Sequence, residues 1–245
     1  MMFCPSRRKI VAGISYFLVA FYVFPYVGVL FAQDESQMLY GVWIDLFYHW
    51  CNFLVILILF LPYLKGSVLQ TLIYRKVFWS TVGILTAIIV AYKIGILFLA
   101  DLSGNILFGN SAFGSLLTSE MDLQWLSAFL LMDQPVWGTL VFVLACPVTI
   151  SCLLYSCVFA PVCINRPRLA YVVMVGVLIL LRALMIFCRW SADQQIVLFL
   201  ITLPVHLLAC LSYHITDTVW APIAVHSFSN LSTALLVHLF FSPVL

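Results

Sequence analysis

A histidine and an asparagine stand four residues apart inside an apolar stretch near the C-terminus. His226 and Asn230 lie in the segment 218–241, which we expect to be helical. Residues four apart share a face of a helix, so both side chains would point the same way. Polar groups inside apolar helices of this kind are costly to bury, and an imidazole can bind a metal or move a proton. The pair therefore indicates either a built site or a hydrogen bond between helices.

Other ionisable residues also interrupt apolar stretches: Asp45, His49, Lys93, Arg182, His206 and His238. Asp45 and His49 are four apart and could hydrogen-bond on one helical face. We expect Asp45 to form a structural ion pair with Lys93 or Arg182, and a proton or ion pathway is the alternative. His206 and His238 are interpreted as interior hydrogen-bonding residues, with metal ligation as the alternative.

The composition indicates that these residues are held by membrane-spanning helices. The chain has 245 residues, of which 65% are hydrophobic and 8% charged, and its mean hydropathy is +1.16. In soluble domains about a quarter of the residues are charged, so this composition is typical of an integral membrane protein. Seven apolar stretches are each long enough to span the hydrocarbon core. They cover residues 10–32, 41–63, 78–100, 136–162, 169–188, 195–213 and 218–241.

We therefore predict an all-α, polytopic transmembrane helical bundle with about seven transmembrane helices. Residues 1–245 would form a single integral membrane domain, with the lipid bilayer as its surroundings. The segment 105–132 is either interfacial or an eighth, re-entrant membrane segment. The basic residues form no cluster large enough to bind nucleic acid.

Basic residues are concentrated in alternate connections between the apolar stretches. Eight of the eleven Lys and Arg residues fall on one side if all seven stretches span the membrane. The positive-inside rule then places the N-terminus in the cytoplasm and the C-terminus outside, in a bacterial-type plasma membrane. The eight residues are Arg7, Arg8, Lys9, Lys65, Arg75, Lys76, Arg166 and Arg168.

The stretch around His226 and Asn230 carries a family resemblance. It reads Asp217-Thr-Val-Trp-Ala-Pro-Ile-Ala-Val-His226-Ser-Phe-Ser-Asn230. This resembles the last motif of the CAAX-protease and bacteriocin-processing (CPBP or Abi) family, which is similar to Trp-Ala-Pro-Ile followed by His-x3-Asn. Tyr213 also stands where that family often has a tyrosine. The resemblance implies a bundle of the kind found in intramembrane metalloproteases, with a CPBP-like core over about 136–241.

The two earlier motifs of that family are rewritten in this chain. The resemblance places the first motif, Glu-Glu-x3-Arg, on Ile150, Ser151 and Tyr155. It places the second motif, Phe-x3-His, on Leu184 and Cys188. The third motif thus keeps its histidine and asparagine, whereas the first two have lost their defining residues.

This loss has a chemical consequence. The family site is thought to hold a metal and a water, with a glutamate as the base. The chain has two glutamates, Glu35 and Glu120, both in predicted outer connections. His226 and Asn230 supply at most two of the roughly three protein ligands that a catalytic zinc needs. We therefore expect a catalytically degenerate member, a pseudoprotease, that binds a membrane-embedded protein partner or peptide segment.

Two alternatives remain open. The chain could be an active metalloendopeptidase with a divergent zinc site built from Cys188, His226, Asn230 and Asp45, since a thiolate also binds zinc. It could instead be a small transporter or ion-pathway protein that uses Asp45, His49, Lys93 and Arg182. No repeated halves with broken helices are visible in the sequence, which argues against a transporter.

Overall fold

The computed structural model describes the backbone of residues 4–31, 38–103, 139–187 and 192–241. Within these ranges it describes the side chains of residues 4–20, 47–96, 139–184, 199–200 and 202–235. The segment 105–132 and the residues Glu35, Glu120 and Cys188 lie outside the described residues. The side chains of Asp45 and His238 are likewise outside the described part.

Each of the seven apolar stretches forms a helix in the described residues, and these residues contain no strand. The fourth stretch combines α-helical and π-helical segments in one unbroken helix over residues 139–163. The other six helices are α1 (Arg7–Phe31), α2 (Met38–Ile73), α3 (Arg75–Ser103), α9 (Pro167–Phe187), α10 (Ala192–Thr216) and α11 (Trp220–Phe241).

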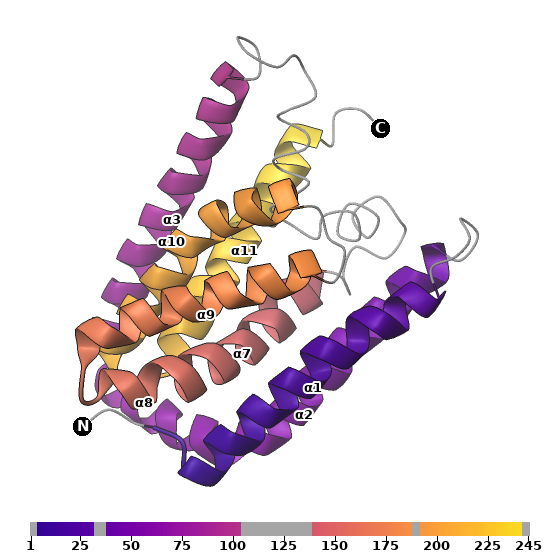
Figure 1. Cartoon of the computed structure of the whole chain (residues 1–245). Coiled ribbons are helices and arrows are strands. Elements are labelled where there is room, and N and C mark those ends of the chain that lie inside the picture. Colours follow the sequence, from indigo (N-terminus) through magenta and orange to yellow (C-terminus); the bar gives the residue numbers. More distant parts are fainter. Residues whose placement is uncertain (1–3, 32–37, 104–138, 188–191, 242–245) are drawn as a thin grey trace.

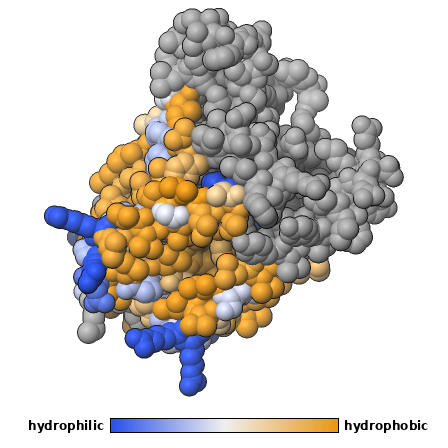
Figure 2. All heavy atoms as spheres, in the orientation of Figure 1, coloured by the Kyte–Doolittle hydropathy of each residue, from blue (hydrophilic) through white to orange (hydrophobic). Residues whose placement is uncertain are grey.

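Four helical stretches with described side chains are long and apolar enough to cross a membrane. They are Phe47–Ile73, Arg75–Ile96, Val141–Cys163 and Pro167–Leu184. Large apolar side chains also cover much of the outer surface (Figure 2), and Ile58, for example, is 73% exposed. An apolar exterior of this kind is typical of an integral membrane protein. The count of seven or eight spans stays a prediction.

The helices pack into two connected groups (Figure 1). The helices α3, α10 and α11 contact one another, and α9 packs against α10. The helices α1 and α2 lie side by side along the other edge. The helix of residues 139–163 lies between the groups, because it contacts α1, α2, α9 and α11. The core of the bundle therefore forms around this central helix.

The central helix contains two π-helical segments. They are η3 (Val141–Ala145) and η4 (Ser151–Phe159), separated by α7 (Cys146–Ile150) and followed by α8 (Ala160–Cys163). Two side chains of η4 donate to the carbonyl five residues earlier, Ser156 at 3.3 Å and Cys157 at 3.2 Å. Segments of π-helix are rare and occur frequently at functional sites.

The prediction of a connection directly after residue 63 is wrong. Helix α2 continues to Ile73, so Lys65 lies within it, and a single residue separates it from α3. The extension is held by tertiary hydrogen bonds, because Ser67 and Thr71 contact the hydroxyl of Thr218 at 2.6 and 2.9 Å. Contacts with a distant segment fix this helix end, and the local sequence does not show them.

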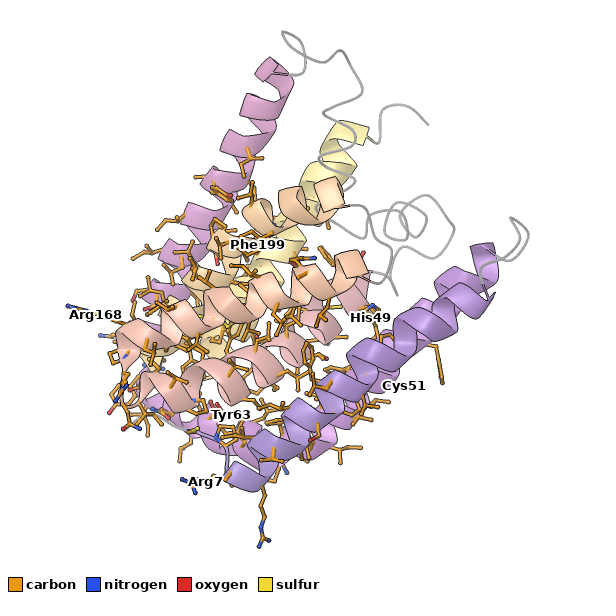
Figure 3. The ribbon with its side chains drawn as sticks, viewed as in Figure 1. Arg7, His49, Cys51, Tyr63, Arg168 and Phe199 are labelled. Carbon is orange, nitrogen blue, oxygen red and sulfur yellow. The ribbon has the colours of Figure 1, made fainter. Side chains whose placement is uncertain are left out.

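The connections between α2 and α3, between α8 and α9, and between α10 and α11 lie at one end of the bundle (Figure 1). The hydrogen bond between Thr71 and Thr218 joins the end of α2 to the start of α11. The Cys163 thiol lies 3.7 Å from Nδ1 of His214, which joins the end of α8 to the end of α10. Arg7 and Arg168 mark the same end (Figure 3), where hydrophilic side chains gather on the surface (Figure 2). The alternation of basic connections across a membrane stays a prediction.

Candidate functional site

The start of α11 is docked onto α2 by residues of the last motif. Asp217 adopts a left-handed conformation with φ of 54°, which aspartate tolerates better than most residues, and this ends α10. The side-chain oxygen of Thr218 accepts the backbone N–H of Trp220 at 3.4 Å, as an N-cap residue does. The Trp220 indole donates to the carbonyl of Leu64 at 3.1 Å. These contacts set where the rest of α11 enters the bundle.

Two turns further along α11, His226 meets a tyrosine of the central helix. The hydroxyl of Tyr155 lies 3.4 Å from Nε2 of His226 and 2.7 Å from Nδ1 of His206 on α10. The two imidazole ring centroids are 5.1 Å apart. All three side chains are buried, and Tyr155 is fully inaccessible. We call these three residues the His–Tyr–His cluster.

Each partner of this cluster comes from a different helix, so the cluster links η4, α10 and α11. A phenol can donate one hydrogen bond and accept others, so one hydroxyl can serve both imidazoles. The tautomers of the rings determine which nitrogen donates. The arrangement holds three helices together through a single oxygen atom in an apolar interior, where hydrogen bonds are strong and unpaired groups are costly.

The other positions assigned to the first motif lie on the same central helix as Tyr155. Ser151 is fully buried one turn before Tyr155, and Ile150 is partly buried. Within the described residues, Oγ of Ser151, Nδ1 of His226 and Oγ of Ser229 are buried without a hydrogen-bond partner. Serine and isoleucine offer no carboxylate, so these positions cannot supply the base of a hydrolytic reaction.

Acidic side chains are scarce in the described interior. Among the side chains that the structure describes, Asp217 is the only carboxylate, and it lies at the turn between α10 and α11. Asp45, the acid that we expected to pair with Lys93 or Arg182, lies outside the described side chains. The predicted ion pair therefore stays a prediction.

Asn230 is engaged with the backbone of the central helix. Its side-chain amide donates to the carbonyl of Phe142 in η3 at 2.8 Å. A π-helical turn changes which carbonyls are bonded within the helix, and here a side chain of another helix bonds one of them. Asn230 and His226 thus share a face of α11, as predicted, and both contact the central helix.

The cationic candidates Lys93 and Arg182, one buried and one partly buried, connect neighbouring helices. Lys93 of α3 is buried and donates to the carbonyl of Ser229 at 3.2 Å and to the hydroxyl of Thr233 on α11. Arg182 of α9 donates to the hydroxyl of Thr202 on α10 at 3.4 Å. A buried cation in a helical bundle needs such partners, and hydroxyl and carbonyl oxygens provide them here.

His49 and Leu184 complete the set of predicted positions. Nδ1 of His49 lies 3.7 Å from the Cys146 thiol, which joins α2 to α7. Leu184 is partly buried on α9 and brings no atom that could bind a metal. The partner position in the second motif, Cys188, lies outside the described residues.

The described residues do not fit the zinc site that the family resemblance implies. They contain no group of three or more His, Cys, Asp and Glu side chains that could hold a metal ion. The His–Tyr–His cluster offers two imidazoles and a phenol, fewer strong ligands than structural or catalytic zinc sites use.

Two parts of this interior were missed by reasoning from the sequence. The hydroxyl of Tyr63 lies 2.8 Å from that of Tyr213 and donates to Ser156 at 3.2 Å, so a second network joins α2, α10 and η4. No charge or spacing marks Tyr63 in the sequence. His206 was noted as an interior histidine, but no motif links it to His226, because the two residues lie on different helices.

Comparisons of the chain with protein-family models, with curated proteins and with solved structures found no match. The fold and the site themselves define a helical protein with apolar, membrane-type helices. Its described interior is organised by hydrogen bonds between helices, with the His–Tyr–His cluster at the contact of η4, α10 and α11.

Proposed function

We propose that the chain is a catalytically degenerate, CPBP-like integral membrane protein that binds a membrane-embedded partner or segment without cleaving it. One observation carries the proposal. Tyr155, at the position of the arginine in the first motif, hydrogen-bonds the retained His226 and also His206. The residues at the former site thus bond one another.

The contacts support the alignment of Ile150, Ser151 and Tyr155 with the first motif of the family, on which the proposal depends. The resemblance requires the helix of the first motif to meet the helix of the last motif. Tyr155 contacts His226 across 71 positions of sequence, and Asn230 bonds the same central helix at Phe142. His226 and Asn230 both contact the helix to which the resemblance assigns the first motif, which supports the proposal.

The chemistry of the site supports the absence of hydrolysis. A metal-dependent peptidase needs a set of ligands and a group that removes a proton from water. Ile150 and Ser151 provide neither a carboxylate base nor an imidazole ligand. Binding of a membrane-embedded segment follows from the resemblance, because family members act on substrates at or in the membrane.

Peptidase activity is the direct test. The purified protein in nanodiscs, supplied with Zn²⁺ or Co²⁺, would be incubated with prenylated CAAX peptides and with a labelled transmembrane peptide. We expect the same background rate for the wild type and for His226→Ala. Turnover that His226→Ala abolishes would mean that the protein is an active endopeptidase.

A restoration experiment tests the alignment separately. The double variant Ile150→Glu, Ser151→Glu would return carboxylates to the first motif. We expect more bound zinc after purification in this variant than in the wild type, since carboxylates would join His226 as ligands. The matched control is Ile150→Gln, Ser151→Gln, which changes polarity without adding charge. Equal zinc in the two double variants would argue against the alignment.

A further inference from the structure

We propose that the junction of α2 and α3 binds the headgroup of an anionic phospholipid. This inference goes beyond the proposed function, because it depends on exposed side chains and not on the family resemblance. We call this surface the junction site. It consists of three basic residues with the exposed apolar and aromatic side chains beside them: Lys65, Leu69, Leu72, Ile73, Tyr74, Arg75, Lys76 and Trp79.

The end of α2 has one face toward the bundle and the opposite face outward. Ser67 is fully buried and lies 2.6 Å from the hydroxyl of Thr218 on the neighbouring segment. Lys65, Leu69 and Leu72 are exposed, and their spacing of four and three residues places them together on the other face. The hydrogen bonds that hold the inner face therefore fix a basic and an apolar group side by side on the outer face.

Two more bases and two aromatic rings follow directly along the chain. Arg75 and Lys76 begin α3 and are exposed, and Tyr74 precedes them. Trp79 is 60% exposed and stands four residues after Arg75, on the same face of α3. Exposed Trp and Tyr are enriched at the level of the lipid headgroups, where one part of the ring is apolar and the other is polar. The junction site thus has the composition of a membrane–water boundary.

The charge at this end of the bundle favours an anion. Asp217 is the only carboxylate among the described side chains. The exposed bases are seven, and hydrophilic side chains gather at this end (Figure 2): Arg7, Arg8, Lys65, Arg75, Lys76, Arg166 and Arg168. Lys and Arg form charge-assisted hydrogen bonds with phosphate oxygens. A phospholipid also needs an apolar surface for its acyl chains, and the junction site offers both next to each other.

The connection between α8 and α9 provides a comparison within the same molecule. It also carries two exposed bases, Arg166 and Arg168. Its aromatic residue, Tyr171, is only partly exposed, and its ring stacks on that of His214, with centroids 6.3 Å apart and an angle of 25° between the rings. The two connections therefore have equal numbers of adjacent bases but differ in the exposed aromatic rings beside them.

The test is a lipid titration followed by native mass spectrometry. Delipidated full-length protein in detergent would be titrated with phosphatidylglycerol and, separately, with phosphatidylcholine of the same acyl chains. We expect the wild type to bind the first phosphatidylglycerol more tightly than the first phosphatidylcholine. Each base near an anionic membrane surface contributes about fivefold in affinity, so Arg75→Gln, Lys76→Gln should weaken phosphatidylglycerol binding by about 25-fold. Its phosphatidylcholine binding should be unchanged.

The matched control is Arg166→Gln, Arg168→Gln, which removes the same charge from the same end. It should weaken the binding of the first phosphatidylglycerol by less than the change at Arg75 and Lys76. A second variant, Lys65→Gln, alters the junction site from α2 alone and should weaken binding by about fivefold. All five side chains are exposed, so these substitutions leave the packing of the core intact.

Three results would overturn the proposal. Equal losses in the two double variants would mean that the basic end attracts lipid only through its total charge. Equal affinity of the wild type for the two lipids would mean that the headgroup charge is not recognised. Displacement of phosphatidylglycerol by an equal concentration of inorganic phosphate would mean that the site binds free phosphate. The peptidase assay is independent of these results, so failure of the junction site and failure of the proposed function are distinguishable.

Discussion

The hydroxyl of Tyr155 serves two imidazoles, so its removal affects two buried groups at once. In Tyr155→Phe, Nδ1 of His206 and Nε2 of His226 lose a shared partner in an apolar interior. Leaving a buried polar group unsatisfied costs about 1–3 kcal/mol. We expect a loss of stability in this range, measured by unfolding in detergent.

The matched control for this experiment is Tyr74→Phe, because Tyr74 is 56% exposed at the junction of α2 and α3. It should leave the unfolding midpoint unchanged. Equal midpoints for Tyr155→Phe and the wild type would mean that the cluster contributes nothing to stability.

Single residues show how much of the site could be predicted from the sequence. The spacing of His226 and Asn230 predicted that both side chains would share a face of one helix, and in the structure both contact the central helix. The resemblance singled out Tyr155 as a replaced position, but its contact with His206 was not predicted. That contact joins three helices, and the local sequence does not record which helices meet.

At the scale of helices, Gly13 of α1 lies at a close contact. A Cβ atom at this position would lie 3.0 Å from Phe60 of α2 and 3.1 Å from Cys157 of η4. Both neighbours are buried and cannot move freely. Small residues let helices approach closely in membranes, and Gly13 has this role here.

We therefore expect Gly13→Ala to lower the free energy of unfolding by about 1–3 kcal/mol through overpacking. The control is Gly176→Ala on α9, where a Cβ atom would meet nothing within 4 Å. That substitution should be neutral or stabilising by up to about 1 kcal/mol, since alanine favours helix. Unfolding in detergent measures both. A larger loss in Gly176→Ala than in Gly13→Ala would contradict this account of the contact.

Helix existence was predictable from the sequence, whereas helix ends and helix type were not. Each apolar stretch is helical, because long apolar runs in a bilayer protein must satisfy their backbone internally. The end of α2 depends on hydrogen bonds from Ser67 and Thr71 to Thr218, a residue far along the chain. The π-helical segments have no marker in the apolar pattern.

For the whole molecule, the clustering of basic residues at one end predicts the membrane topology. Green fluorescent protein fused after Tyr74 or Asn165 should fluoresce, because the positive-inside rule places this basic end in the cytoplasm. Alkaline phosphatase fused after Asp101 should be active, because this point lies on the opposite side. Reporter assays in intact cells measure both results.

The fusion after Asn165 is the most informative of the three. An additional span within 105–132 would reverse its orientation relative to the fusion after Asp101. A fusion after Asn165 that does not fluoresce, and that is active when alkaline phosphatase replaces the fluorescent protein, would therefore contradict both the seven-span arrangement and the predicted cytoplasmic position of the basic end.

The π-helical segment η4 has a consequence for how this protein tolerates changes in length. Because its N–H groups bond five residues back, one residue can be deleted between Ser151 and Phe159 while the ladder closes into an ordinary α-helix. A π-helical turn holds about one residue more than an α-helical turn, so the residues after the deletion would stay on nearly the same face of the helix. Shortening the chain here would thus preserve the contacts of the following side chains, whereas the same deletion in an ordinary α-helical segment would rotate them by about 100°.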